Sequence, residues 1–249
     1  MRLIYSLIFI FLLIIILGYK KYIDYENYNN DPYITVIARG GLNNKIRVML
    51  SYLYRANKEN KKLCVIWIKD NECPDDYNTL FYPISNMEVI SYDNNMSDFT
   101  TWSIDNEEYV QEKYHKLLKP LPNIQENINR FKILLGNEYI ACHIRRTDIV
   151  IHEGQSWYKP KTDQEYMNFI NQYDSNLYIY IATDNKDTQD VFINKYKNRV
   201  IIKPIIPSIE LRQTSVQDAL VDMYVCIGSK YFLGSRGSSF TETINYMRQ

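Results

Sequence analysis

The sequence has no excess of either charge, because lysine plus arginine and aspartate plus glutamate each number 29. A balanced chain has no overall field that attracts nucleic acid or an acidic surface. We therefore expect no nucleic-acid partner, and recognition of a charged ligand must depend on local clusters.

Cysteine is scarce, and none of the four cysteines has the spacing of a zinc ligand. Cys64 and Cys142 stand in apolar, strand-like runs and Cys226 in a helical one, where a free cysteine behaves as a small buried hydrophobe. The stretch "ATDNKD" (182–187) is similar to a metal-binding Asp-x-Asp, but Asp184 before a helix is more often its cap. We expect no metal site.

The sequence also lacks the glycine patterns of the dinucleotide fold and of the P-loop. The nearest approach is "RGGLNNKIR" (39–47), which joins an expected strand to an expected helix. Its two glycines permit a tight turn, and an ordinary turn with a helix cap is the alternative explanation. The residues that we expect to line this loop are Gly40, Gly41, Asn43, Asn44 and Arg47.

One long apolar run stands at the amino terminus, "LIYSLIFIFLLIIILGY" (3–19), between Arg2 and Lys20. Its length is close to the roughly 20 residues that span a bilayer. A cleaved signal peptide is the alternative, but no small-residue cleavage site follows. We expect a transmembrane signal anchor over 1–21 and a short stem over 22–32. The flanking charges oppose each other, and we predict a single-pass type II protein with a lumenal catalytic part.

Strand and helix patterns alternate from residue 33 onward. Such alternation, with strands apolar on both faces, is typical of doubly wound parallel sheets. We predict an α/β fold of the GT-B type, with two Rossmann-type lobes over 33–136 and 137–249 and a cleft between them. The expected strands are 33–39, 63–69, 87–92, 139–145, 177–183, 199–205 and 230–235, and the expected helices are 43–60, 107–118, 124–135, 162–173, 186–196, 215–227 and 241–247.

The motif "HIRRTD" (143–148) follows the strand that opens the second lobe. Because side chains alternate along a strand, His143 and Arg145 share one face and Arg146 turns away. Ligands of such sheets bind at the carboxyl ends of the strands, and a guanidinium suits phosphate oxygens. An ion pair of Arg146 with Asp148 beside a core histidine is the structural alternative.

A second site for an anion is suggested by "GSRGSSFTET" (234–243), in which a strand ends and a helix begins at Ser238 or Ser239. Free backbone N–H groups and hydroxyls there meet the positive end of the helix dipole. Ser239 with Glu242 also forms an ordinary capping box, and capping and phosphate binding can coexist.

Four stretches in order resemble the GDP-fucose-dependent fucosyltransferases, the alpha-1,6-fucosyltransferases and protein O-fucosyltransferases in particular. They are "GGLNNKIR", "HIRRTD", "IYIATDN" and "DALVDMYVCIGSKYFLGSRGSSF", and the resemblance covers nearly all of 33–249. It implies a GT-B-type fold with an acceptor-side first lobe and a second lobe that binds GDP-fucose. It also implies inversion at the sugar carbon, no cofactor and no required metal.

The resemblance assigns roles to individual residues. His143 is similar to the histidine near the nucleotide, Arg145 to the diphosphate clamp, and Asp222 to the aspartate that accepts from guanine. Glu153, ten residues after His143, matches the general base proposed in the alpha-1,6 enzymes. The donor-binding set also includes Arg146, Ser238, Ser239 and Phe240, and Asn44 resembles the loop asparagine of the first lobe.

Two departures keep the acceptor and the linkage open. Ile149 stands where the alpha-1,6 enzymes carry a lysine, and the chain has neither their long helical stem nor their trailing module. The sequence predicts a membrane-bound, inverting fucosyltransferase that acts on a glycan or protein hydroxyl. Another nucleotide-sugar donor and a catalytically degenerate glycan-binding module are the alternatives.

Overall fold

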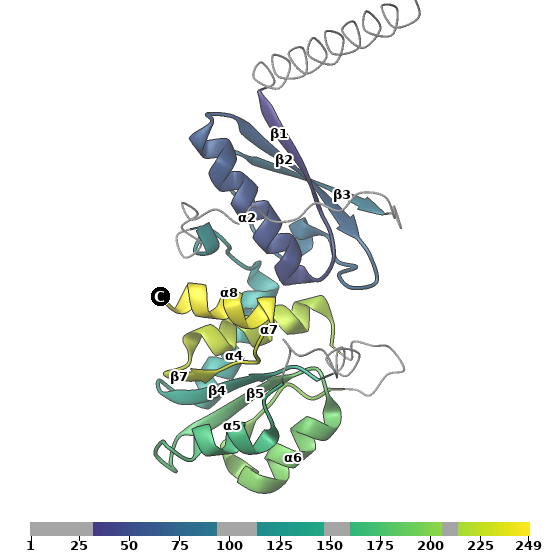
Figure 1. Ribbon diagram of the computed structural model, residues 1–249. Helices are drawn as coiled ribbons and strands as arrows, with labels where there is room; N and C mark the ends of the chain where they lie inside the picture. The colour runs from purple at the N-terminus through teal and green to yellow at the C-terminus, as the bar shows by residue number, and fades with distance from the viewer. Residues whose placement is uncertain (1–31, 94–113, 147–159, 206–213) are drawn as a thin grey trace, which may run out of the picture.

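The computed structural model describes residues 32–93, 114–146, 160–205 and 214–249, which form two parallel β-sheets flanked by helices (Figure 1). The first sheet has the order β1-β2-β3 and the second the order β6-β5-β4-β7. The strands are β1 (Tyr33–Ala38), β2 (Lys62–Lys69), β3 (Met87–Asp93), β4 (Tyr139–Ile144), β5 (Tyr178–Thr183), β6 (Val200–Ile201) and β7 (Tyr231–Leu233). The helices are α2 (Leu42–Lys58), α4 (Pro122–Leu135), α5 (Asp163–Ile170), α6 (Lys186–Tyr196), α7 (Val216–Gly228) and α8 (Ser239–Arg248), with short 3₁₀ turns η1 (Tyr77–Thr79) and η3 (Lys197–Arg199).

Helix α2 forms because its apolar residues recur at helical spacing. Ile46, Met49, Leu50 and Leu53 are all fully buried against the first sheet. Each such side chain contributes roughly 1.5–3 kcal/mol by leaving water. This burial fixes the amino end of α2, and with it the loop after β1, beside the second half of the chain.

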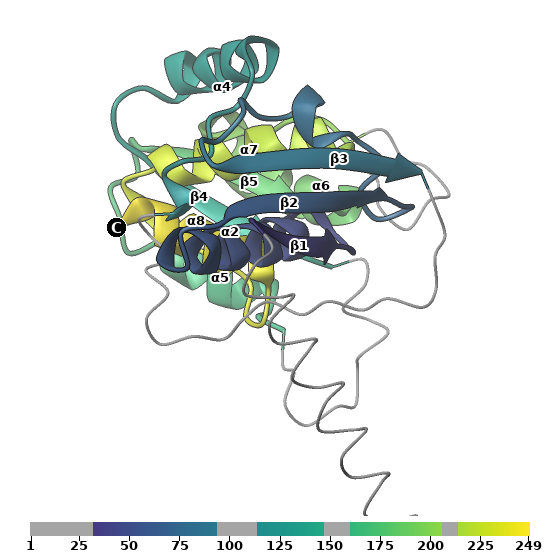
Figure 2. The ribbon, with the colours of Figure 1, turned by 90° about the horizontal axis from the view of Figure 1, so that it is seen from above.

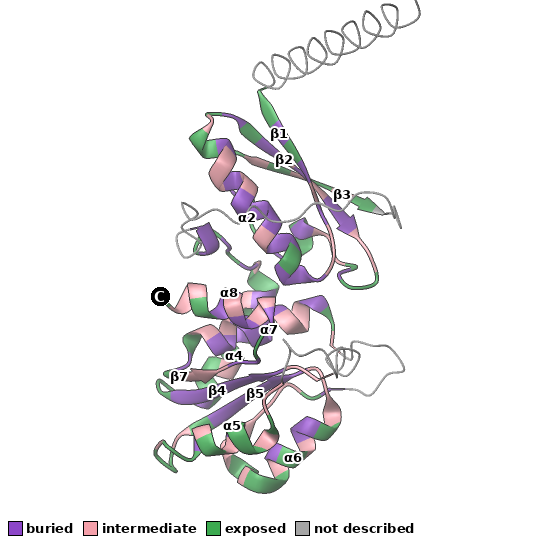
Figure 3. Cartoon of the chain, in the orientation of Figure 1, coloured by how far each residue is buried: buried purple, intermediate pink, exposed green. Residues whose placement is uncertain are grey.

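Strand β4 is buried over all six residues (Figure 3). Its side chains divide between two cores. Ile140, Cys142 and Ile144 pack with α5 and α6. Ala141 faces the opposite way, into a continuous core that includes α4, α7 and the first sheet. Figure 2 shows the strands and helices of both halves from above. The predicted alternation along this strand is confirmed, and it places His143 and Arg145 on the side of the first sheet.

The second sheet reverses its strand order at β4, which pairs with β5 on one side and with β7 on the other. In open parallel sheets, ligands bind beyond the carboxyl ends of the strands at such a switch point. The backbone N–H of Arg145, just after β4, donates to Ser235 Oγ, just after β7, at 2.9 Å. The two segments that follow these strands therefore meet at the expected crevice.

The predicted strand 199–205 is confirmed only at Val200 and Ile201. Pro204 has no N–H to donate to a ladder. The segment around it bonds to α6 instead, since Gln189 donates to the Lys203 carbonyl at 2.7 Å and accepts from the Ile205 N–H at 3.2 Å. Most of the predicted helix 107–118 lies outside the described residues.

Within the part of the chain that the structure describes, no helix has the length and apolar character needed to cross a membrane. The predicted anchor over 1–21 and nearly all of the predicted stem lie outside those residues.

Candidate active site

A cavity of about 280 Å³ lies where the loop before α2 meets the carboxyl ends of β4 and β5 and the amino ends of α7 and α8. Both halves of the chain contribute to its wall. The lining residues are Gly41, Leu42, Asn43, Asn44, Glu72, His143, Arg145, Ala182, Thr183, Asp184, Thr214, Ser215, Val216, Ala219, Asp222, Ser239 and Phe240.

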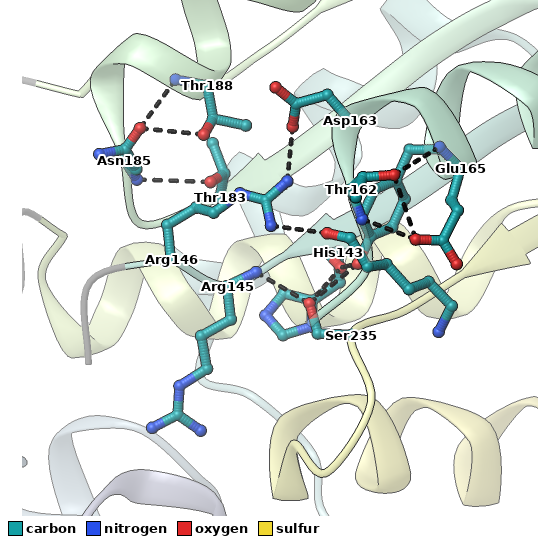
Figure 4. A network of polar contacts seen from close by, with 12 residues as sticks. His143, Arg145, Arg146, Thr162, Asp163, Glu165, Thr183, Asn185, Thr188 and Ser235 are labelled. Atoms are coloured by element: carbon teal, nitrogen blue, oxygen red, sulfur yellow. Dashed lines mark hydrogen bonds and ion pairs between the residues drawn. The ribbon is translucent and has the colours of Figure 1, made fainter. Parts of the chain in front are cut away.

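The two arginines of "HIRRTD" have different environments. Arg145 lines the cavity, and Figure 4 shows its side chain leaving the strand in the opposite direction from that of Arg146. Arg146 donates to the Lys161 carbonyl at 2.8 Å and to Asp163 Oδ1 at 2.5 Å. Arg146 is thus not among the cavity residues, although we grouped it with the donor-binding set. Its acidic partner is Asp163, and Asp148 lies outside the described residues.

His143 is only 8% exposed and stacks on Phe240, with ring centroids 4.5 Å apart. Its Nδ1 lies 2.8 Å from Thr241 Oγ1. Burial, and then the charge of Arg145, lower the pKa of the imidazole to about 3. The ring is therefore neutral at physiological pH, and it contributes hydrogen bonding rather than charge.

Asp222 projects from α7 into the same cavity and is 8% exposed. The Tyr180 hydroxyl donates to its Oδ1 at 2.5 Å. Burial raises the pKa of Asp222 to about 7, although the Tyr180 hydrogen bond and the charge of Lys203 act in the opposite direction. A small change in surroundings therefore decides whether this carboxyl is charged.

Three helices direct their amino ends toward the cavity, namely α2, α7 and α8. A helix amino end carries unpaired N–H groups and a partial positive charge. Together with Arg145 they make this part of the cavity suited to an anion. Asp184 is also in the wall, where its Oδ1 accepts from the Arg146 N–H at 2.8 Å, and the cap of α6 is Asn185.

The capping of α8 differs from the prediction. Ser238, and not Ser239, is the cap, and its Oγ accepts from the Thr241 N–H at 3.5 Å. Ser239 and Phe240 line the cavity. The close approach of α8 needs Gly234, since an added Cβ there would lie 2.5 Å from Thr241 Oγ1.

The loop before α2 contributes three of its five predicted residues to the cavity wall, and Gly40 and Arg47 are not among the lining residues. Gly40 has a φ of 76°, a value that favours glycine, and Gly41, Asn43 and Asn44 line the cavity. Arg47 does not, because its guanidinium pairs with Glu242 of α8. That pair links α2 to α8. Because Ser238 is the cap, the third helical position is Thr241, so Glu242 stands one residue too late to complete a capping box.

Sequence reasoning missed Glu72, which lies in the loop after β2 and lines the cavity. It also missed Lys45, which is fully buried, donates to the Cys73 carbonyl at 3.0 Å and lies 3.7 Å from Asp70. A lysine among the apolar positions of a helix is a signal that pattern reading could have used, since a buried charge requires partners. Glu72 stands in an irregular loop and carries no such signal.

The described residues contain no group of three or more His, Cys, Asp or Glu side chains placed to hold a metal ion. Glu153, the predicted base, lies outside those residues.

The sequence profile of the family described as GDP-fucose protein O-fucosyltransferase matches residues 47–249, which is most of the chain. The chain belongs to this O-fucosyltransferase family. The predicted membership is confirmed, and with it the prediction of an enzyme of the fucosyltransferase class. No curated protein gives a significant sequence match.

Solved structures of other fucosyltransferases have the same fold as this family member. The NodZ alpha-1,6-fucosyltransferase soaked with GDP-fucose is 15% identical with a TM-score of 0.61, over 88% of this chain and 93% of that one. NodZ from Bradyrhizobium is 13% identical with a TM-score of 0.60, over 87% of this chain and 93% of that one. POFUT1 in complex with GDP-fucose is 12% identical with a TM-score of 0.63, over 88% of this chain and 95% of that one. The predicted GT-B-like α/β fold with parallel sheets is thereby confirmed.

Proposed function

We propose that the protein transfers fucose from GDP-fucose to a hydroxyl group of a glycan or protein, with inversion at the sugar carbon. The observation that carries the proposal is one cavity in which Arg145 and three helix amino ends lie together with the buried carboxyl of Asp222. Positive groups beside a hydrogen-bond acceptor suit a guanosine diphosphate. Family membership and the GDP-fucose complexes of NodZ and POFUT1 support the same donor.

The donor is held by groups of three kinds. Arg145 and the amino ends of α7 and α8 bind the diphosphate, with Ser239 offering a further hydroxyl. Asp222 accepts hydrogen bonds from the guanine N1–H and 2-amino groups. His143 and Phe240, which stack on each other, form the wall beside the nucleotide.

The reaction joins the acceptor oxygen to the anomeric carbon as the bond from that carbon to the β-phosphate oxygen breaks. Negative charge grows on the departing GDP, and preorganised positive groups lower the barrier by stabilising it. Arg145 and the helix dipoles supply these groups, so we propose that no metal is required. Glu153 receives the proton of the attacking hydroxyl.

The direct test is incubation of residues 22–249 with GDP-fucose, GDP-mannose and UDP-sugars while GDP or UDP release is measured. We expect release of GDP from GDP-fucose. If a nucleotide were released only from one of the other sugar donors, that donor would replace GDP-fucose in the proposal. Binding of GDP-fucose without any release would identify a glycan-binding module instead. Glu153→Gln should retain GDP binding and lose transfer, and an active variant would remove Glu153 as the base.

We also propose that residues 1–21 anchor the enzyme as a single-pass type II protein with its catalytic part in a lumen. The support is the apolar run 3–19. Protease protection of the full chain in sealed microsomes tests the orientation, since a lumenal catalytic part should be digested only after detergent is added.

A further inference from the structure

Asn43 has an unsatisfied acceptor in the wall of the cavity. Its side chain is 5% exposed, and its Oδ1 has no hydrogen-bond partner among the described residues. A buried acceptor without a partner costs roughly 1–3 kcal/mol. Because Asn43 lines the cavity, a ligand with a hydrogen-bond donor can remove that cost.

Glu72 brings a second acceptor to the same wall. Its carboxylate lies beside the loop that carries Asn43, since a Cβ added at Gly40 would be 3.6 Å from Glu72 Oε2. Both residues come from the first sheet's side, and Arg145 and His143 come from the second. We call the side with Asn43 and Glu72 the acceptor-rich wall. The opposite side carries Arg145, the one cationic side chain among the described lining residues, together with Asp184 and Asp222.

The position of the acceptor-rich wall is fixed by Asp70. Its Oδ2 accepts from the Gly40 N–H at 3.2 Å, and its Oδ1 accepts from the Glu72 N–H at 2.9 Å. The buried ammonium of Lys45 lies 3.7 Å from Asp70 and holds this carboxylate in place. One side chain thus joins the loop of Asn43 to the loop of Glu72, so the two acceptors keep a defined spacing.

These acceptors select a particular part of a nucleotide sugar. A diphosphate is attracted to Arg145 and to the amino ends of α7 and α8, so the phosphates lie on the second sheet's side, away from the carboxylate of Glu72. Hydroxyl groups donate to carboxylate and amide oxygens, and they can also accept from N–H donors. A sugar ring presents both functions at once.

We propose that Asn43 and Glu72 bind the hydroxyl groups of the sugar carried by the nucleotide and thereby help to select that sugar. The inference rests on the proposed function, because it assumes a GDP-sugar donor in this cavity. It deepens that function by assigning donor-sugar recognition to two residues of the first sheet's side.

The test compares the affinities for GDP and GDP-fucose by titration calorimetry in the wild type, Asn43→Ala and Glu72→Gln. We expect each substitution to weaken GDP-fucose binding by about threefold to tenfold, the effect of losing one hydrogen bond, and to leave GDP binding unchanged. Unchanged GDP binding also shows that the variant is folded. Asn127→Ala and Glu126→Gln, on the exposed face of α4, are the matched controls.

Three outcomes would count against the proposal. Unchanged affinities for both GDP and GDP-fucose in both variants overturn it and assign the wall to the acceptor or to structure alone. Equal loss of GDP and GDP-fucose binding overturns it in favour of a phosphate contact. Failure of the wild type to bind GDP at all refutes the proposed function itself, which keeps the two failures distinct.

Discussion

The Tyr180 hydroxyl and the Asp222 carboxyl form a 2.5 Å hydrogen bond in which the tyrosine donates, at the edge of the cavity. Tyr180 is fully buried under α7, so its hydroxyl cannot turn to water. The bond stabilises the charged form of Asp222 against a burial that favours the neutral form. Protonation of this one carboxyl therefore bears directly on the proposed recognition of guanine.

GDP binding should weaken as the pH falls below 7. The pKa of Asp222 is about 7 in the free protein, and only the carboxylate accepts from both guanine donors. Between pH 8 and pH 6 we expect a loss of roughly tenfold in the association constant, measured by calorimetry. The Asp222→Asn variant should bind GDP weakly, and its GDP affinity should lack the pH dependence that comes from titration of Asp222. The phosphate groups of GDP titrate in both proteins, so the difference between the two pH profiles isolates Asp222.

Removal of the Tyr180 hydroxyl should shift the pH profile of GDP binding. Tyr180→Phe deletes a hydrogen bond that lowers the pKa of Asp222, so the pKa rises and the midpoint of GDP binding moves to higher pH. The lost bond should also reduce the free energy of unfolding by about 1 kcal/mol. Tyr178→Phe, at an exposed position of the same strand, is the matched control. A midpoint that stays in place or moves to lower pH would refute the assigned role.

Much of the fold could be predicted because it depends on local patterns. The strand alternation that separates Arg145 from Arg146 is a property of β4 alone, and the burial of Ile46 and Leu50 follows from helical spacing. The carboxyl ends of β4 and β7 lie at one edge because the two strands are parallel neighbours. That ligands bind at such a switch point is a rule of the fold class.

What could not be predicted depends on contacts between distant segments. Arg47 looked like a loop residue of the cavity, but its partner Glu242 is 195 residues away. Glu72 enters the wall because Asp70 bonds to Gly40 across two loops. No period within either segment encodes such a contact, so a single sequence gives no signal for it.

His143 and Asp222 should have opposite effects on the pH dependence of stability. The pKa of His143 is about 3 in the folded protein and 6.5 in a free histidine, so its contribution is present above pH 6.5 and is lost as the pH falls. The pKa of Asp222 is raised from 3.8 to about 7, so its contribution is present below pH 3.8 and is lost as the pH rises through 7. Between pH 4 and 6.5 the two slopes oppose each other.

Urea unfolding at several pH values separates these two contributions. Relative to the wild type, Asp222→Asn should lose stability more steeply on acidification, because the slope from His143 is then unopposed. His143→Gln should lose stability less steeply, or gain it. Parallel curves for all three proteins would show that neither group titrates as proposed.

Substitution of the two neighbouring arginines should give opposite phenotypes. Arg145→Ala removes a cation from the cavity, and we expect GDP affinity to fall by about tenfold to a hundredfold, the effect of losing a hydrogen bond to a charged group. Guanosine, which has no phosphate, should bind Arg145→Ala as it binds the wild type.

Arg146→Ala removes the bonds to Asp163 and to the Lys161 carbonyl, which join the end of β4 to the start of α5. We expect a loss of about 1–2 kcal/mol in the free energy of unfolding, measured in urea, with GDP affinity close to that of the wild type. Each variant serves as the control for the other, because the substitutions are identical and one residue apart. If Arg146→Ala weakened GDP binding as much as Arg145→Ala, the division between a ligand-binding and a structural arginine would be wrong.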